Sequence, residues 1–176
     1  MTAEQFVRSS KAGATGETSK PAKEKKAPSF PPNPEPLEVA VYDNHCHLEF
    51  EFDDELGVMP WQENLDRAGA VGIKGVVQVG VTLESSKWCA DLATKDQRVL
   101  AAVALHPNEA PLYKTRENLD AAIAEIEALA AQPRVRAIGE TGLDFFRTEG
   151  DNDLELQQHS FEEHIRIAKD NNIALM

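Results

Sequence analysis

Cysteine and long apolar runs are scarce in this sequence of 176 residues. It contains two cysteines, Cys46 and Cys89, and neither belongs to a CxxC pair. Two such residues exclude the disulfide framework of a small secreted domain. No run approaches the roughly 18 consecutive apolar residues of a membrane span, and the N-terminus lacks an apolar stretch followed by a small-residue cleavage site. These absences predict a cytoplasmic chain without a membrane partner.

Positive charge is also scarce. Lys and Arg number 18 against 30 Asp and Glu, which gives a formal net charge of -12. Residues 1–36 carry six basic and four acidic residues, so residues 37–176 carry twelve basic and 26 acidic residues, a balance of -14. Such a body has no basic face with which to bind nucleic acid by counterion release. Any phosphate chemistry is therefore local or carried by bound metal ions.

The composition changes near residue 36. Residues 1–36 are rich in Ala, Lys, Ser, Thr, Gly and Pro, with five prolines between positions 28 and 36. This composition predicts a disordered tail and an extended Pro-rich linker. Residues 37–176 are predicted to form the folded domain.

Short β-branched runs alternate with helical periods from residue 37 onward. Thr82 or Ser85 is expected to cap the second helix, and Asn152 with Glu155 is expected to form a capping box at the start of the last. Strands are predicted over 39–43, 75–80, 99–105, 134–139 and 173–176, and helices over 61–68, 84–94, 115–131 and 152–170.

Such alternation implies parallel strands joined by helical crossovers. Two α/β folds compete at this point. An open doubly wound sheet is complete with five strands, whereas a (β/α)8 barrel needs eight strands and about 250 residues. Composition alone does not choose between them.

The strongest local signal is the pair His45 and His47 at the end of the first predicted strand. Because side chains alternate along a strand, the two imidazoles share one face and Cys46 points to the other. Two imidazoles so placed can bind one metal ion, although a pair of surface histidines is the alternative. The carboxyl ends of parallel strands carry the sites of α/β folds, which favours the metal. Cys46 is predicted to be a small core residue.

A second signal follows the fourth predicted strand. Glu140 stands between Gly139 and Gly142 on the same rim, where it is either a carboxylate ligand able to bridge two cations or a solvated loop residue. Asp144 either orients a metal-bound imidazole or forms a turn. Arg147 either grips a phosphate oxygen or pairs with acidic neighbours.

Other histidines carry weaker signals. His106 precedes a proline at the end of the third predicted strand, and is either a site residue or a partner in a loop hydrogen bond. His159 and His164 are expected to be exposed on the last helix. The acidic group after the histidine pair is either a weak cation site or a solvated loop; it comprises Glu49, Glu51, Asp53, Asp54 and Glu55.

Five segments, taken in order, resemble the TatD family of metal-dependent deoxyribonucleases. The segments are DNHCHL at 43–48, VVQVGV at 76–81 with LESS at 83–86, LHP at 105–107, IGETGLD at 138–144, and QQ at 157–158 leading into an Ala/Ile-rich helix. The resemblance implies an amidohydrolase-type TIM barrel that hydrolyses DNA phosphodiester bonds with a metal-activated water. It also implies two divalent ions, of Mg, Mn or Zn, with His45 and His47 holding one and Glu140, the catalytic residue, bridging both. Substrate-binding candidates are His106 and Arg147, and Asp144 is a candidate for orienting a metal-bound imidazole. No obligate protein partner is evident.

The chain departs from the family pattern in three respects. Thr141 stands where the family usually has Ile, and Asn108 stands where it tends to have a second His. The family's later ligands, two histidines and an aspartate, follow the fifth and later strands and are absent. The resemblance thus implies a partial barrel, strands 1–5 of 8, with little nuclease activity on its own. Another amidohydrolase-type enzyme acting on a small molecule, or a non-catalytic fragment, is the alternative.

Overall fold

A computed structural model of the chain describes residues 29–49 and 57–176. Residues 1–28, most of the predicted tail, lie outside the described residues, as do Glu51, Asp53, Asp54 and Glu55 of the acidic group. The strands are β1 (Val41–Cys46), β2 (Ile73–Val79), β3 (Val99–Val103), β4 (Val135–Ile138) and β5 (Ala174–Leu175). The helices are α1 (Trp61–Ala70), α2 (Leu83–Lys95), α3 (Arg116–Ala130) and α4 (Asp151–Asn171), with a short 3-10 helix, η1 (Ala110–Tyr113).

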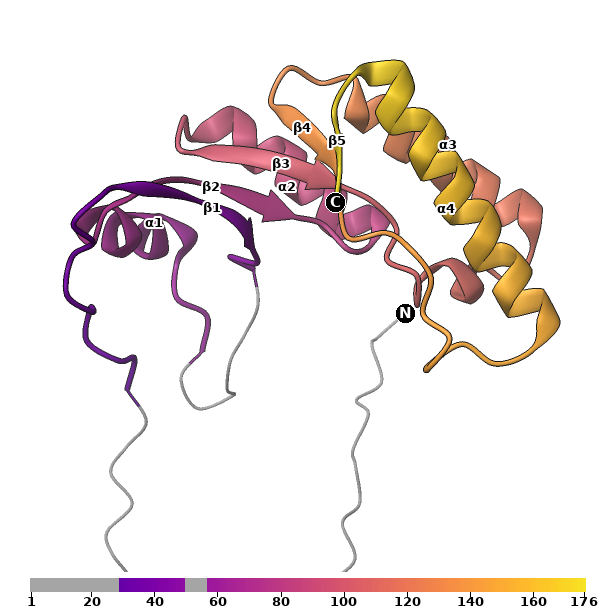
Figure 1. Cartoon of the computed structure of the whole chain (residues 1–176), viewed down its shortest axis with the longest axis horizontal. Coiled ribbons are helices and arrows are strands. Elements are labelled where there is room, and N and C mark those ends of the chain that lie inside the picture. Colours follow the sequence, from indigo (N-terminus) through magenta and orange to yellow (C-terminus); the bar gives the residue numbers. More distant parts are fainter. Residues whose placement is uncertain (1–28, 50–56) are drawn as a thin grey trace, which may run out of the picture.

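The five strands form one parallel sheet in the order β1-β2-β3-β4-β5. A doubly wound sheet reverses its strand order at a switch point, whereas a barrel adds each strand beside the one before it. The sequential order therefore decides for the barrel. Figure 1 shows the curved sheet, with α3 and α4 packed together beyond β4 and β5. The fold is a half-barrel, as the sequence resemblance implied.

Alternating residues build two apolar layers on the sheet. Val76 and Ala101 belong to the large core between the sheet and its helices. Their neighbours Val77 and Ala102 belong to a smaller cluster on the opposite face, with Val79 and Ala137. This alternation is the period of two that a strand imposes on its side chains. Both faces of these central strands are thus apolar, which matches their near-continuous hydrophobic sequence.

Helix ends agree with the sequence at α2 and differ from it at α4. The Thr82 side chain accepts a hydrogen bond from the backbone N–H of Ser85, and the Ser85 side chain returns the contact to complete a capping box. The capping box predicted for Asn152 and Glu155 is wrong. Helix α4 begins one residue earlier, after Gly150, which has a φ of 92° and offers no side chain for a cap.

The predicted exposure of His159 and His164 is also wrong. His159 is 8% exposed, and its Nε2 lies 2.5 Å from Asp120 of α3. His164 is fully buried, and its Nε2 accepts a hydrogen bond from the backbone N–H of Leu105 at 3.0 Å. Helix α4 packs against both α3 and the sheet, and the two histidines lie on the side of α4 that this packing buries. Among the described residues, no helix is both long and apolar enough to cross a membrane.

Candidate metal centre

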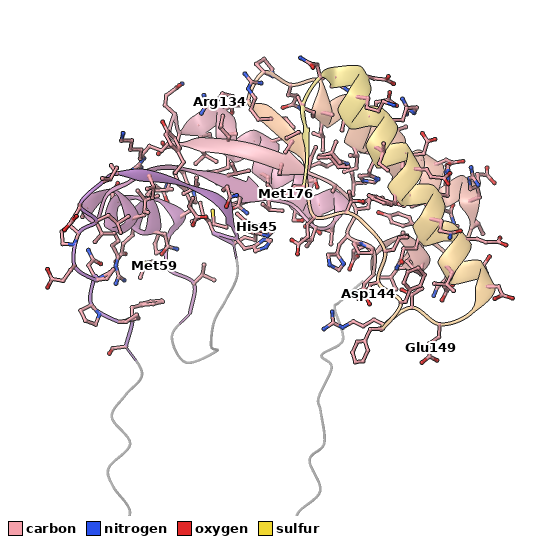
Figure 2. All side chains as sticks on the ribbon, viewed as in Figure 1. His45, Met59, Arg134, Asp144, Glu149 and Met176 are labelled. Atoms are coloured by element: carbon pink, nitrogen blue, oxygen red, sulfur yellow. The ribbon has the colours of Figure 1, made fainter. Side chains whose placement is uncertain are left out.

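Strand β1 brings two imidazoles to the rim of the sheet. The His45 and His47 rings lie with their centroids 5.2 Å apart at an interplanar angle of 71°. The Asp43 side chain accepts a hydrogen bond from the backbone N–H of His45 at 3.0 Å, which shapes the end of the strand. Figure 2 shows His45 at this end of β1. The pair therefore occupies the carboxyl end of the strand, as the sequence predicted.

Glu140 reaches the same rim from the end of β4. It has a φ of 37°, in the left-handed region that non-glycine residues rarely adopt. Backbone strain of this kind concentrates at functional sites. The residue before it, Gly139, packs so tightly that a Cβ there would lie 2.6 Å from the Ala102 Cβ. The sheet thus holds Glu140 through a closely packed and strained backbone.

The three side chains converge on one point. The Nε2 atoms of His45 and His47 lie 3.3 Å apart, and each lies 3.4 Å from Oε2 of Glu140. These three atoms form a nearly equilateral triangle. In the described part of the chain, they lie close enough together to hold a single metal ion. The structure therefore brings together the three side chains that the sequence singled out as ligands.

The geometry of this triangle fits a divalent cation. Ligand atoms about 2.1 Å from a tetrahedral zinc ion lie about 3.4 Å from one another, which matches the observed separations. Oε2 of Glu140 is buried and accepts no hydrogen bond from any residue that the structure describes. A buried carboxylate oxygen needs a positive or donating partner. Two imidazole nitrogens and one carboxylate oxygen are also a ligand set suited to Zn, Mn or other divalent ions.

Cys46 stands between the two histidines but belongs to the core. It packs against the main apolar cluster, and its Sγ donates to the side-chain oxygen of Gln78 at 3.7 Å. Burial, together with the nearby charges of Asp43 and Glu49, raises the pKa of the Cys46 thiol to about 12. A protonated thiol is a poor metal ligand, because the thiolate is the binding form. The structure agrees with the core role predicted for this residue.

Gln78 of β2 is a residue that the sequence analysis missed. Its side chain is fully buried, and its Oε1 accepts a hydrogen bond from the backbone N–H of Leu48 at 2.8 Å. Its Nε2 donates to Glu49 Oε2 at 2.5 Å. Together with the Cys46 contact, these bonds tether the residues on both sides of His47. The available signal was an amide in the middle of an otherwise apolar strand, VVQV.

The remaining candidates lie on the same rim but outside the triangle. His106 Nδ1 accepts a hydrogen bond from the backbone N–H of Asn108 at 3.1 Å. Asp144 Oδ1 accepts the backbone N–H groups of Phe146 and Arg147 at 2.9 and 3.1 Å. Burial alone would raise the pKa of Asp144, but these bonds and the Asn108 side chain hold it below its ordinary value. The Nη1 atom of Arg147 lies 3.7 Å from Oδ2 of Asp144.

A buried amide joins the loops that carry these candidates. Gln157 of α4 is fully buried and donates from Nε2 to the Pro107 carbonyl at 3.0 Å and to the Thr148 hydroxyl at 2.7 Å. Its Oε1 accepts the backbone N–H of Asp144 at 2.8 Å. Helix α4 thereby fixes the loop after β3 and the loop after β4 to each other.

A parallel half-barrel with two histidines at the carboxyl end of its first strand and a glutamate after its fourth defines an α/β half-barrel protein with a candidate metal centre. Comparison with known proteins narrows this class: residues 42–176 match the family model described as TatD related DNase. The chain therefore belongs to the TatD family.

Curated relatives support the same assignment. An uncharacterized metal-dependent hydrolase, TatD, of Mycobacterium tuberculosis is 44% identical over 60% of this chain and 39% of its own length. The 3'-5' ssDNA/RNA exonuclease TatD of Cronobacter turicensis is 33% identical over 60% of this chain and 38% of its own. The uncharacterized metal-dependent hydrolase YabD of Bacillus subtilis is 30% identical over 77% of this chain and 49% of its own length. The chain thus spans half or less of the length of these relatives.

Solved structures agree on the fold. YjjV, a TatD homologue of Escherichia coli, superposes with a TM-score of 0.59 at 26% identity, over 77% of this chain and 49% of that one. An uncharacterized amidohydrolase of Saccharomyces cerevisiae gives the same TM-score of 0.59 at 18% identity, which shows the fold alone.

Proposed function

We propose that the centre formed by His45, His47 and Glu140 takes part in metal-dependent hydrolysis of DNA phosphodiester bonds, with single-stranded DNA as the substrate. The observation that carries this proposal is the triangle of three ligand atoms at 3.3 to 3.4 Å. The substrate class is supported by the relatives named as 3'-5' ssDNA/RNA exonucleases.

The residues have distinct roles in this proposal. His45, His47 and Glu140 would hold the cation, and the charge of Glu140 would offset that of the cation. A divalent ion supplies Lewis acidity, which lowers the pKa of water and offsets negative charge on phosphoryl oxygens. We propose two such ions, of Mg, Mn or Zn, with Glu140 shared between them. Arg147, whose side chain is 67% exposed, and His106 are proposed to contact the phosphate.

The electrostatics of the chain are consistent with this chemistry. Residues 37–176 carry a balance of -14, so the protein surface itself repels a polyanion. Bound cations reverse the potential locally, at the one place where the phosphate must approach. The proposal therefore reconciles an acidic protein with an acidic substrate.

Calorimetric titration of the purified chain with Mn2+ or Zn2+ tests the metal centre. We expect saturable binding that is lost in His45→Ala and in Glu140→Gln. Glu149→Gln is the matched control, because Glu149 is an exposed glutamate of the same loop. Equal binding in all four proteins would overturn the centre.

Cleavage of a 5'-labelled single-stranded oligonucleotide tests the reaction. The chain is used in excess over the oligonucleotide, so that slow cleavage can be detected. Slow cleavage that needs the metal ion, and that disappears in Glu140→Gln but persists in Glu149→Gln, is the expected result. Metal binding without any metal-dependent cleavage would contradict the nuclease proposal while leaving the metal centre intact.

A further inference from the structure

Two adjacent phenylalanines are held out into solvent on the rim that carries the metal centre. Phe146 is 88% exposed and Phe145 is 66% exposed. They follow Asp144 in the loop between β4 and α4, and Figure 2 shows Asp144 on this loop, below the sheet on the same side as His45. Aromatic side chains normally contribute most of their stabilisation by being buried. Two neighbouring rings left in water therefore need a partner.

The loop that presents these rings is ordered by its own hydrogen bonds. Asp144 Oδ1 accepts the N–H groups of Phe146 and Arg147, and the Asp144 N–H is held by Gln157 at 2.8 Å. Gln157 also holds the Thr148 hydroxyl on the far side of the rings. The residues before and after the exposed rings, Asp144 and Thr148, are thus both held by hydrogen bonds to Gln157. A rigid loop loses little conformational entropy when a ligand binds to it.

The loop is close to the metal centre along the chain. Phe145 is five residues beyond Glu140 in sequence, and five extended residues span at most about 17 Å. A nucleic-acid strand advances about 3.4 Å per nucleotide along a stacked helix. Bases within roughly five nucleotides of a phosphate at the metal centre therefore fall within reach of the loop.

The charge of the chain favours recognition of bases over recognition of the backbone. With a balance of -14 over residues 37–176, the domain has little positive charge with which to form the groove that usually follows the phosphates. Stacking on an aromatic ring needs no such groove, because every base has a flat apolar face. Arg147, which is 67% exposed, adds one cation directly beside the rings.

We propose that Phe145 and Phe146 form a stacking platform for unpaired nucleobases of the strand whose phosphate lies at the metal centre. The platform deepens the proposed nuclease function and rests on it. Stacked bases must be unpaired, so the platform selects single strands and orients them toward Glu140. It is a binding subsite and takes no part in bond breaking.

Fluorescence anisotropy of a labelled single-stranded oligonucleotide, measured with a metal chelator present, tests the platform apart from cleavage. Base stacking on aromatic side chains predicts that Phe146→Ala weakens binding by about 5-fold or more, and that the double change with Phe145→Ala weakens it further. Tyr42→Ala is the matched control, because Tyr42 is an aromatic of β1 with a similar exposure of 68%. Phe146→Trp is expected to keep the affinity and to add an indole fluorescence that the bound bases quench.

An oligonucleotide with abasic sites in place of several nucleotides separates stacking from charge. Wild-type protein should bind it more weakly than the intact strand, and the double variant Phe145→Ala with Phe146→Ala should bind both alike. Equal loss in Tyr42→Ala, no preference for intact bases, or no binding by the wild-type chain would overturn the platform. So would a self-associated wild-type chain that Phe146→Ala converts to monomer without a change in oligonucleotide affinity. Binding in this assay, combined with no metal-dependent cleavage in the separate cleavage assay, would support the platform and contradict only the nuclease reaction.

Discussion

The buried side chain of Gln78 accepts a hydrogen bond from the backbone N–H of Leu48 at 2.8 Å, one residue after His47. The same amide contacts Cys46, one residue before it. Strand β2 therefore fixes the backbone on both sides of an imidazole that belongs to β1. This contact gives β2 a role in the metal centre although it contributes no ligand.

Replacing Gln78 with Leu is expected to weaken metal binding. The change keeps the volume but leaves the Leu48 N–H without its acceptor, so that His47 loses its fixed orientation. Loss of a residue that orients a ligand typically costs 10- to 100-fold in metal affinity, and we expect about 10-fold here. Calorimetry with Mn2+ or Zn2+ measures the effect, with Gln97→Leu, a change in the turn before β3, as control. Unchanged affinity in a folded Gln78→Leu protein would show that β1 orients His47 without help.

Gly139→Ala is expected to destabilise the chain. The added Cβ would lie 2.6 Å from the Ala102 Cβ, so the backbone beside Glu140 must move. Overpacking of this kind costs about 1–3 kcal/mol in the free energy of unfolding. Urea unfolding followed by circular dichroism measures this loss.

Gly69→Ala provides the control for that experiment. Gly69 lies in α1, and among the described residues nothing apart from its chain neighbours and its own helix backbone lies within 4 Å of the position of its Cβ. Alanine there is expected to raise stability slightly, because glycine is the poorer helix former. If both variants unfold alike, close packing at Gly139 does not limit the fold.

The stability of the chain is expected to fall as the pH drops below about 6.5. Burial lowers the pKa of His164, although the Ser160 carbonyl and the charge of Glu163 act in the other direction. Because the Leu105 N–H donates to Nε2, the proton sits on Nδ1, which faces the Ser160 carbonyl at 2.6 Å. The unfolded chain therefore binds a proton at a pH where the folded chain does not. Stability is complete above the unfolded pKa of 6.5 and declines below it, by up to about 1.4 kcal/mol per pH unit from this one group.

Two measurements check the role of His164. Urea unfolding between pH 5 and 8 should give a slope that His164→Gln reduces, since glutamine has no proton to gain in this range. NMR titration of labelled histidine should find His164 still neutral at pH 6.5. A protonated His164 ring at that pH in the folded protein would contradict the prediction.

Gln157→Leu is expected to loosen the loop that carries Asp144. Three hydrogen bonds of the buried amide would be lost, and each buried group left without a partner costs about 1–3 kcal/mol. Hydrogen exchange at the Asp144 amide should accelerate at least 10-fold. Gln158→Leu, at the exposed neighbouring position, is the control and should leave this amide protected. Equal protection in both variants would show that the loop is held by other contacts.

Much of the local structure could be read from the sequence. Periodicity placed all five strands and four helices within a few residues of their observed bounds, because burial of one face imposes its period on neighbouring residues. The helix start at Thr82 was predictable for a similar reason, since a cap involves residues only three positions apart. At α4 the same reasoning failed. The helix begins after Gly150, and the residue types of Asn152 and Glu155 do not indicate the conformation of that glycine.

Tertiary structure decided what depends on distant partners. Strand order separated a half-barrel from a doubly wound sheet, and no local pattern encodes which strands lie side by side. His159 and His164 look like surface residues until α4 packs on α3 and on the segment after β3, where Asp120 and the Leu105 N–H become their hydrogen-bond partners. The sequence determined which residue types stand at the strand ends, His45, His47 and Glu140 among them. Only the parallel pairing of β1 through β4 brought their ligand atoms within 3.4 Å, because the carboxyl ends of parallel strands share one rim.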